Sequence, residues 1–167
     1  EIWGCAAPFC NQPFVSTLIV SMPGAGKTTL LRDMVRILSE KGYRVSLCDE
    51  RGEISAWSES GFGFDVGRHT DVLVDLPKSQ AAMQMIRTMN PQILAMDEIS
   101  SDEDCETVRH VIGCGVDLLA TAHAEAPEEL MRRPLYRKLL EERIFSYALS
   151  IRQECGKRVY SMEKLPE

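Results

Sequence analysis

Several patterns that mark common classes of protein are missing from this sequence. It has six cysteines but no C-x-x-C pair, and none of its three histidines stands at zinc-finger spacing. Scattered cysteines favour reduced thiols in a cytoplasmic protein over a disulfide framework or a structural zinc site. No apolar run reaches the length of a membrane span, and no signal peptide is present.

Basic charge and aromatic residues are also scarce. Lys and Arg together number 19 against 25 Asp and Glu, which gives a net charge of −6, and aromatic residues make up only 7%. Without a stripe of basic and aromatic residues, nucleic acid is not an expected partner. The 167 residues, 44% of them hydrophobic, are enough for one globular domain with a buried core.

The first residue is Glu1 and not methionine, and residues 1–16 contain two prolines and no steady hydrophobic period. We therefore expect residues 1–16 to be a lead-in or linker from an N-terminal region that this sequence lacks. Residues 17–167 are expected to form the domain.

Beyond residue 16, short apolar runs alternate with amphipathic segments. The expected strands are 15–20, 43–49, 92–98 and 116–123, and the expected helices are 27–42, 77–89, 100–113 and 127–140, the last broken at Pro134. Residues 143–165 indicate a terminal β-hairpin around Gly156. This order predicts an α/β domain with a mostly parallel sheet and helices on both faces.

Three local features have structural interpretations. Residues 50–75 are rich in glycine and serine, and we expect a long functional loop there. In the helix that follows, Asp75 is a possible cap, and a stripe containing Met85 and Met89 is interpreted as core packing. The acidic first turn of the helix at 100–113 is explained by the helix dipole, with Ser100 or Ser101 as its cap.

The segment VSMPGAGKTTLL (residues 20–31) is close to the phosphate-loop pattern G-x-x-x-x-G-K-[ST], but Ser21 stands at the first glycine position. The glycines just before the helix let backbone N–H groups wrap a phosphate, and Gly24 and Gly26 stand there. The first glycine only eases the strand into its turn, so a small serine can replace it. An apolar strand before and a helix after favour a phosphate loop over a chance glycine-rich turn.

The other loop positions predict binding of ATP and Mg²⁺. Lys27 would supply positive charge to the β- and γ-phosphates, and Thr28 would offer its hydroxyl to Mg²⁺. The predicted nucleotide-binding residues are Pro23, Gly24, Ala25, Gly26, Lys27, Thr28 and Thr29.

An acidic pair ends the strand ILAMDE (residues 93–98). Asp97 would lie near the Mg²⁺ held by Thr28, and Glu98 could polarise a water for attack on the γ-phosphate. By itself such a pair can be a strand end that meets solvent. Behind a phosphate loop it becomes a strong indication of ATP hydrolysis.

Polar residues end two further strands on the same edge. His123 ends the strand LLATAH, which we expect between the phosphate-loop strand and the Asp97 strand, so His123 would emerge beside the γ-phosphate. A solvated histidine at a strand end is the alternative. After the second strand, Asp49, Glu50 and Glu53 could hold Mg²⁺ through water or orient the attacking water, and spacing leaves open which one does.

These segments together resemble one family. The ordered runs are MPGAGKTTLLRD, CDERGEI, DVGRHTDVL, PKS, MIRTMNPQILAMDEI and GVDLLATAH, over roughly residues 18–160. They are similar to the stage III sporulation AA family of RecA-like ATPases, which is related to the type II and type IV secretion motors. In that family a phosphate loop, an acidic box, a Walker B strand and a histidine box fall on Gly24–Thr29, Asp49–Glu53, Asp97–Glu98 and Thr121–His123.

The resemblance implies a RecA-like fold, ATP hydrolysis with Mg²⁺, and a homo-oligomeric ring that is hexameric by analogy. It also implies a cytoplasmic location, peripheral at the membrane of a sporulating bacterium, with membrane-embedded sporulation channel proteins as partners. The acidic residues 100–106 and the basic residues 131–138 could be complementary faces of such a ring, or two solvated helix surfaces.

Two departures concern arginine. The family pattern is D-V-G-x-R-T-D, whereas here Arg68 precedes His69 and is displaced by one position. Secretion motors carry an arginine shortly after the Walker B glutamate, where this chain has residues 100–102, SSD. Arg68 therefore remains a candidate catalytic arginine whose reach into a neighbour's site is open.

The favoured hypothesis is a Mg²⁺-dependent ATPase motor. One alternative is a nucleotide-binding assembly module with little hydrolysis of its own, which the displaced arginine favours slightly. A less favoured alternative is a small-molecule kinase that uses residues 51–75 as a lid. The pairing of Asp97–Glu98 with His123 fits attack by water better than transfer to a bound hydroxyl.

Overall fold

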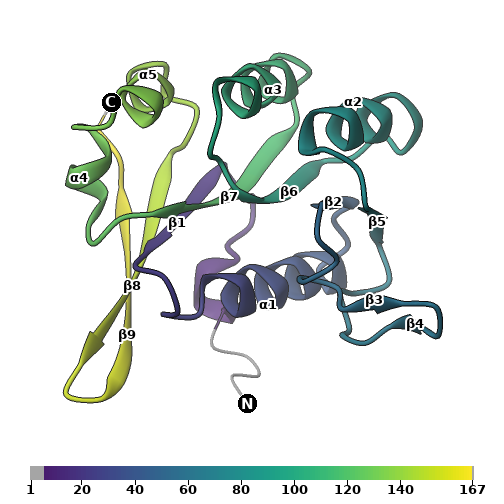
Figure 1. The fold of residues 1–167 in the computed structure, drawn as a ribbon, viewed down its shortest axis with the longest axis horizontal. Helices are drawn as coiled ribbons and strands as arrows, with labels where there is room; N and C mark the ends of the chain where they lie inside the picture. Colours follow the sequence, from purple (N-terminus) through teal and green to yellow (C-terminus); the bar gives the residue numbers. More distant parts are fainter. Residues whose placement is uncertain (1–5, 167) are drawn as a thin grey trace.

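The central feature of the fold is a seven-stranded sheet, seen in the computed structural model, which describes residues 6–166 and only the backbone of Phe62 (Figure 1). Its strands lie in the order β5-β2-β6-β7-β1-β8-β9. Neighbouring strands are parallel except β8 and β9, which form the predicted C-terminal hairpin. The strands are β1 (Thr17–Ser21), β2 (Val45–Asp49), β5 (Thr70–Val74), β6 (Ile93–Glu98), β7 (Asp117–His123), β8 (Tyr147–Glu154) and β9 (Lys157–Lys164).

Helices cover both faces of the sheet, as predicted. In Figure 1, α1 packs below the sheet, and α2, α3 and α5 pack above it. Each face has its own hydrophobic core, one centred on residues such as Leu31 and Met34 of α1, the other on residues such as Met85 of α2 and Val108 of α3. The helices are η1 (Ala7–Phe9), α1 (Lys27–Glu40), α2 (Lys78–Thr88), α3 (Asp102–Gly113), α4 (Pro127–Leu130) and α5 (Pro134–Glu141).

The inner strands of the sheet are apolar because helices cover both faces of the sheet. All five residues of β1 are buried, and so are the first four residues of β6. Buried parallel strands of this kind lack alternation of polar and apolar residues. β7 lies between β6 and β1, as the sequence predicted, so the carboxyl ends of these three strands meet at one edge.

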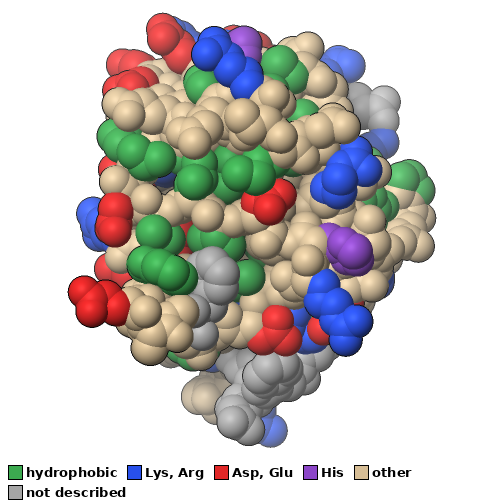
Figure 2. Space-filling view, turned by 90° about the vertical axis from the view of Figure 1, so that its right-hand side faces the viewer, with side chains coloured by type: hydrophobic (Ala, Val, Ile, Leu, Met, Phe, Trp, Pro, Cys, Tyr) green, Lys and Arg blue, Asp and Glu red, His purple; other side chains and the backbone are tan. Residues whose placement is uncertain are grey.

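Residues 50–75 differ from the expected long loop. They contain a two-stranded hairpin of β3 (Trp57–Ser58) and β4 (Gly61–Phe62), followed by β5, which pairs with β2 at the edge of the main sheet. β5 is only partly buried because it has a neighbour on one side alone. Figure 2 shows the face of the molecule on this side, where acidic, basic and hydrophobic side chains are intermixed. β5 is a short edge strand with polar residues on either side of it. It therefore lacks the continuous apolar segment by which the inner strands are recognised in the sequence.

The start of α2 also differs from the expectation. Pro77 is the N-cap residue and no side chain caps the helix, whereas Asp75 has left-handed backbone with φ 57°. Asp75 is therefore a turn residue and not the cap. The methionine stripe is core as predicted, since Ala82 and Met85 are fully buried and Met89 packs against them.

The segment before β1 packs on α1. Ala6, Cys10 and Phe14 are buried in the same core as α1, and the Ala6 N–H donates to Asp33 Oδ2 of that helix at 3.3 Å. Residues 1–5 of the expected lead-in lie outside the described residues. Within residues 6–166, no helix is long and apolar enough to cross a bilayer.

Candidate functional site

The loop between β1 and α1, called the glycine loop here (Met22–Gly26), has the backbone that its sequence predicts. Gly24 has φ 75° and Gly26 has φ 105°, values that glycine adopts without strain. Gly26 is the N-cap of α1, with no side-chain cap and no acidic residue in the first turn. The first N–H groups of this helix are therefore available to an anion, and the helix dipole favours one there.

Lys27, the first residue of α1, is turned back under the loop and is only 7% exposed. Its Nζ donates to the carbonyl oxygens of Ser21 at 3.1 Å and Met22 at 3.4 Å. Burial lowers the pKa of the Lys27 ammonium below its usual value, while the negative charges of Glu98 and Asp97 act in the opposite direction. The two carbonyl oxygens hold the Lys27 Nζ at the base of the glycine loop.

His123 joins Lys27 to Glu98. The Lys27 ammonium lies 2.8 Å from Nδ1 of His123, and Nε2 of the same ring lies 2.9 Å from Glu98 Oε2. An ammonium group can only donate, so Nδ1 accepts, and Nε2 carries the proton that is donated to the carboxylate. The structure therefore brings together three predicted catalytic residues that come from α1, β6 and β7.

A bulge in β6 explains how two consecutive acids can both face this site. Between β6 and β7 the register shifts, because Ala95 pairs with Leu119 while Glu98 pairs with Thr121, which leaves one extra residue in β6. An extra residue of this kind redirects the side chains around it. Asp97 Oδ1 accepts a hydrogen bond from Thr121 Oγ1 at 3.1 Å, and the charges of Asp97 and Glu98 both act on Lys27.

The donor set fits Mg²⁺ bound together with phosphate. Thr28 lies in the first turn of α1, half-buried, and Asp97 stands one residue before the end of the inner strand β6, at the same sheet edge. Mg²⁺ is bound through one or two protein oxygens, with phosphate oxygens and water completing its six ligands. Among residues 6–166, no cluster of three or more His, Cys, Asp or Glu side chains could hold a metal by itself. The roles of Thr28 and Asp97 as Mg²⁺ ligands therefore stay predictions that require a bound phosphate.

The acidic residues after β2 divide into one structural residue and two exposed ones. Asp49 is buried, with Oδ1 accepting the Ile54 N–H at 3.1 Å and Oδ2 accepting the N–H and the hydroxyl of Ser55 at 2.8 and 2.6 Å. Glu50 and Glu53 are exposed, and neither carboxylate has a hydrogen bond to another described residue. Asp49 therefore fixes the turn, and the catalytic roles of Glu50 and Glu53 stay predictions.

Arg68 lies at the opposite edge of the sheet from the glycine loop. The next residue, His69, donates its N–H to Ser39 Oγ near the end of α1 at 2.7 Å, and its carbonyl accepts from Val45 N at the start of β2 at 2.9 Å. Lys27 begins the same helix, so most of its 14 residues, roughly 20 Å, separate the two regions. A catalytic role for Arg68 stays a prediction and requires the site of another chain.

A mostly buried lysine, to which the sequence pattern assigned no role, holds the acidic end of β6. Lys78, at the start of α2, donates to the backbone carbonyl of Glu98 and lies 3.3 Å from Asp104 Oδ2. Asp104 accepts the N–H groups of Ser100 at 2.8 Å and Ser101 at 3.1 Å. Burial opposes ionisation of Asp104, but these donors and the Lys78 charge hold the pKa of the carboxyl below its usual value. The segment after Glu98 is therefore anchored to α2 through Lys78 and to α3 through Asp104.

We expect Lys78→Met to destabilise the protein by roughly 3 kcal/mol, the scale for removing one partner of a buried ion pair. The change leaves the Asp104 carboxylate buried without its cation and the Glu98 carbonyl without its donor. Urea unfolding measures the loss. Ser79→Ala, which removes an exposed hydrogen bond to Glu103 next door, should stay within about 0.5 kcal/mol of the parent protein. Equal stability of both variants would show that Lys78 anchors nothing.

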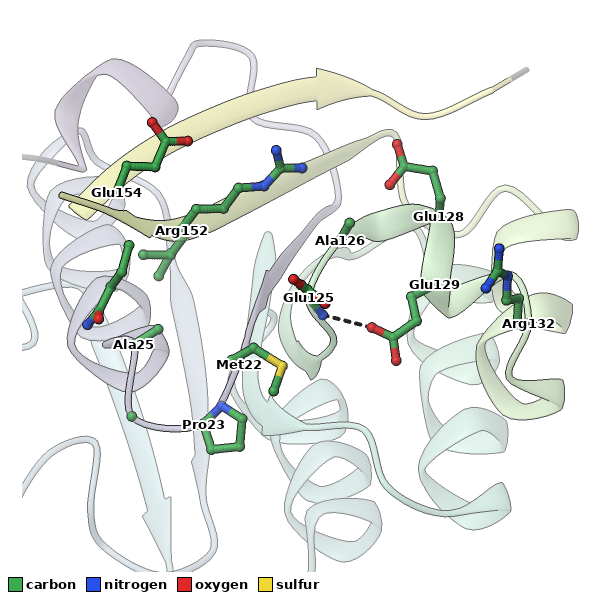
Figure 3. Close-up of a pocket in the computed structure, with 13 residues that line it drawn as sticks. Met22, Pro23, Ala25, Glu125, Ala126, Glu128, Glu129, Arg132, Arg152 and Glu154 are labelled. Atoms are coloured by element: carbon green, nitrogen blue, oxygen red, sulfur yellow. Dashed lines mark hydrogen bonds between the residues drawn. The ribbon is translucent and has the colours of Figure 1, made fainter. Parts of the chain in front are cut away.

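A cleft of about 1030 Å³ opens beside the glycine loop. Figure 3 shows Met22, Pro23 and Ala25 on one side and Arg152 and Glu154 of β8 on another. The segment around α4 forms the remaining wall, contributing Glu125, Ala126, Glu128, Glu129 and Arg132 (Figure 3). The cleft is mixed in charge and wide enough for a nucleotide.

The sheet order, the helices on both faces and a glycine loop between β1 and α1 define the class of P-loop ATPase folds. The VirB11 ATPase from the Brucella suis type IV secretion system superposes with a TM-score of 0.62 at 14% identity, over 90% of this chain and 48% of that chain. The pilus retraction motor PilT superposes with a TM-score of 0.64 at 19% identity, over 92% of this chain and 48% of that chain. At these identities the likeness shows the fold.

The family follows from the sequence. Residues 1–160 match the family described as sporulation stage III, protein AA, and the chain belongs to that family. It is 36% identical over 156 residues to Stage III sporulation protein AA of Bacillus subtilis (strain 168), which covers 89% of this chain. The chain spans 50% of the length of that relative. The resemblance predicted from the ordered motifs is confirmed.

Proposed function

We propose that this domain binds ATP with Mg²⁺ and hydrolyses it to ADP and phosphate, as the nucleotide-driven part of a sporulation motor. The observation that carries the proposal is the contact chain Lys27–His123–Glu98 directly under the glycine loop. A lysine at the base of such a loop suits a triphosphate, and a carboxylate held next to it suits activation of water.

The binding step uses the backbone and one cation. The N–H groups of Gly24 to Thr28 and the start of α1 would surround the β-phosphate, and Lys27 would move its donors from the carbonyl oxygens of Ser21 and Met22 to phosphate oxygens. Thr28 and Asp97 would hold Mg²⁺, which neutralises charge on the β- and γ-phosphate oxygens when bound.

The chemical step assigns the proton to Glu98. A water attacks the γ-phosphorus, the bond between that phosphorus and the bridging oxygen breaks, and its electron pair stays with the β-phosphate. The Glu98 carboxylate takes the proton of the water. The Nε2–H of His123 keeps the Glu98 carboxylate in place. Nδ1 of the same ring contacts Lys27, the residue that would bind the γ-phosphate. In this scheme His123 positions the Glu98 base, and its contact with Lys27 changes when Lys27 binds phosphate.

The assembly and its partners belong to the same proposal. We propose that the domain works in a homo-oligomeric ring, hexameric by analogy with the secretion motors, at the cytoplasmic side of a membrane-embedded sporulation channel. The chain spans half the length of its Bacillus subtilis relative, so the assembly and partners of the whole protein belong to the proposal.

The test is a phosphate-release assay run beside light scattering on the purified protein. We expect phosphate release with ATP and Mg²⁺ and none when EDTA removes the metal, together with a larger particle when ATP is present. ATP binding without release would replace the proposal by a nucleotide-dependent assembly module. Absence of binding would end both.

A further inference from the structure

The C-terminal hairpin brings an arginine onto the glycine loop. β8 runs parallel to β1, with Leu18 paired to Ala148, so its end emerges beside the loop (Figure 1). β9 then returns along β8, and Arg158 stands opposite Gln153. The space that a side chain on Gly26 would occupy is filled by this arginine, because a Cβ there would lie 3.2 Å from Arg158 Cζ. The guanidinium therefore packs on the last glycine of the loop.

The charge of Arg158 is not used by the protein itself. Within residues 6–166 no carboxylate pairs with it, although Glu154 is nearby on the same hairpin. By contrast, Arg133 near the same edge is paired with Glu129 at 2.7 Å. An unpaired guanidinium against a loop that presents N–H groups and a buried lysine adds to a surface built for an anion.

We propose that Arg158 binds a phosphate group of the ATP held by the glycine loop of the same chain, an inference that rests on the proposed function. A guanidinium offers a planar fork of donors that matches two phosphate oxygens. It contacts Gly26, one residue before Lys27, so both cations lie at the same end of α1. Arg158 then supplies in cis the arginine charge that Arg68, at the far edge of the sheet, cannot supply to its own loop.

This assignment gives the hairpin a link to the nucleotide state. ATP would draw the guanidinium, and with it the β8–β9 connection, toward the glycine loop, and loss of the γ-phosphate would weaken that contact. β8 also lines the large cleft through Arg152 and Gln153, so nucleotide exchange would shift this wall of the cleft.

The first experiment compares ATP affinity in four proteins by equilibrium binding of fluorescent ATP. We expect Arg158→Ala to weaken binding roughly tenfold or more, the scale of one charged hydrogen bond, and Arg158→Lys to fall in between. Lys157→Ala is the matched control, because it removes a neighbouring exposed cation of the same hairpin, and it should stay within about twofold. Circular dichroism and thermal unfolding check that each variant is folded.

The outcomes separate this inference from the proposed function. If the parent protein does not bind ATP, the proposed function fails. If it binds and Arg158→Ala binds equally well or more tightly, the arginine assignment alone is overturned, and tighter binding would identify a side chain that obstructs the loop.

A mixing experiment decides between the same chain and a neighbour. Lys27→Ala protein keeps Arg158 but loses its own site, and Arg158→Ala protein keeps the rest of its site. An arginine that acts in cis predicts that the turnover of mixtures equals the weighted sum of the two variants. Recovery of activity above that sum would show that Arg158 serves an adjacent chain and would overturn the assignment.

Discussion

Glu98→Gln should bind ATP within a few-fold of the parent protein while its turnover falls by at least about 100-fold, the scale of losing a general base. Glutamine has the same shape, and its amide oxygen can still accept the hydrogen bond that His123 Nε2 makes to the carboxylate at 2.9 Å. The amide cannot take a proton from water. Binding and chemistry are therefore expected to separate cleanly at this position.

The measurement is single-turnover phosphate release together with equilibrium ATP binding. Glu50→Gln and Glu53→Gln are matched controls, because both remove an exposed carboxylate from the same sheet edge without touching Lys27 or His123. Because the proposed function assigns the proton of the attacking water to Glu98, and not to the alternatives Glu50 and Glu53, both variants should keep turnover within a few-fold of the parent. If Glu98→Gln turns over normally and one of these controls does not, the water-activating role moves to the acidic segment after β2.

Asp49→Ala should destabilise the protein by roughly 3 kcal/mol or more, the sum expected when buried donors lose their acceptor. The Ile54 N–H, the Ser55 N–H and the Ser55 hydroxyl all donate to this carboxylate, and all three groups would be left in the interior. The turn they form carries the carbonyl oxygens of Glu53 and Ile54, to which Arg32 of α1 donates. Losing Asp49 would thus loosen the packing of this turn on α1.

Urea unfolding, with Glu50→Ala as the control at the next position, measures this loss. Glu50 is exposed, so its removal should change stability by less than about 0.5 kcal/mol. Asp49→Asn is a milder test, because the asparagine amide oxygen can still accept some of these hydrogen bonds. A protein of parent stability that fails only in Mg²⁺-dependent turnover would contradict the structural role and favour a metal-related one.

The fold was predictable wherever a segment was buried on both sides. The inner strands β1, β2, β6 and β7 are apolar runs that each end in a polar residue, and they were located to within two residues. β5 was missed because an edge strand needs only partial burial, and this one begins with the polar residues Thr70 and Asp71. Its pairing with β2 is a long-range contact that local pattern does not encode.

The site was predictable to the level of the strand ends. Parallel topology brings Lys27, Glu98 and His123 to one edge, and the usual strand order of phosphate-loop sheets placed β7 between β6 and β1. The bulge between Ala95 and Glu98 was not predictable, because the sequence ILAMDE is compatible with regular alternation. Without the bulge, Asp97 and Glu98 would be expected on opposite faces of the sheet.

The roles of Lys78 and Arg158 could not be read from the sequence. Lys78 stands at a helix start, where lysine is usually solvated, and only the packing of α2 against α3 brings it to Asp104. Arg158 follows the turn of a hairpin, and its contact with Gly26 requires β8 to lie next to β1. Both are contacts between segments far apart in the chain.

The account depends most directly on a triphosphate held by Lys27, and equilibrium binding of fluorescent ATP to Lys27→Ala tests it. Lys41→Ala, which removes a lysine next to the other end of the same helix, is the control. We expect the affinity of Lys27→Ala to fall at least tenfold, as loss of a buried charged hydrogen bond implies, with Lys41→Ala unchanged. ATP affinity that is the same in Lys27→Ala as in the parent protein would contradict the account.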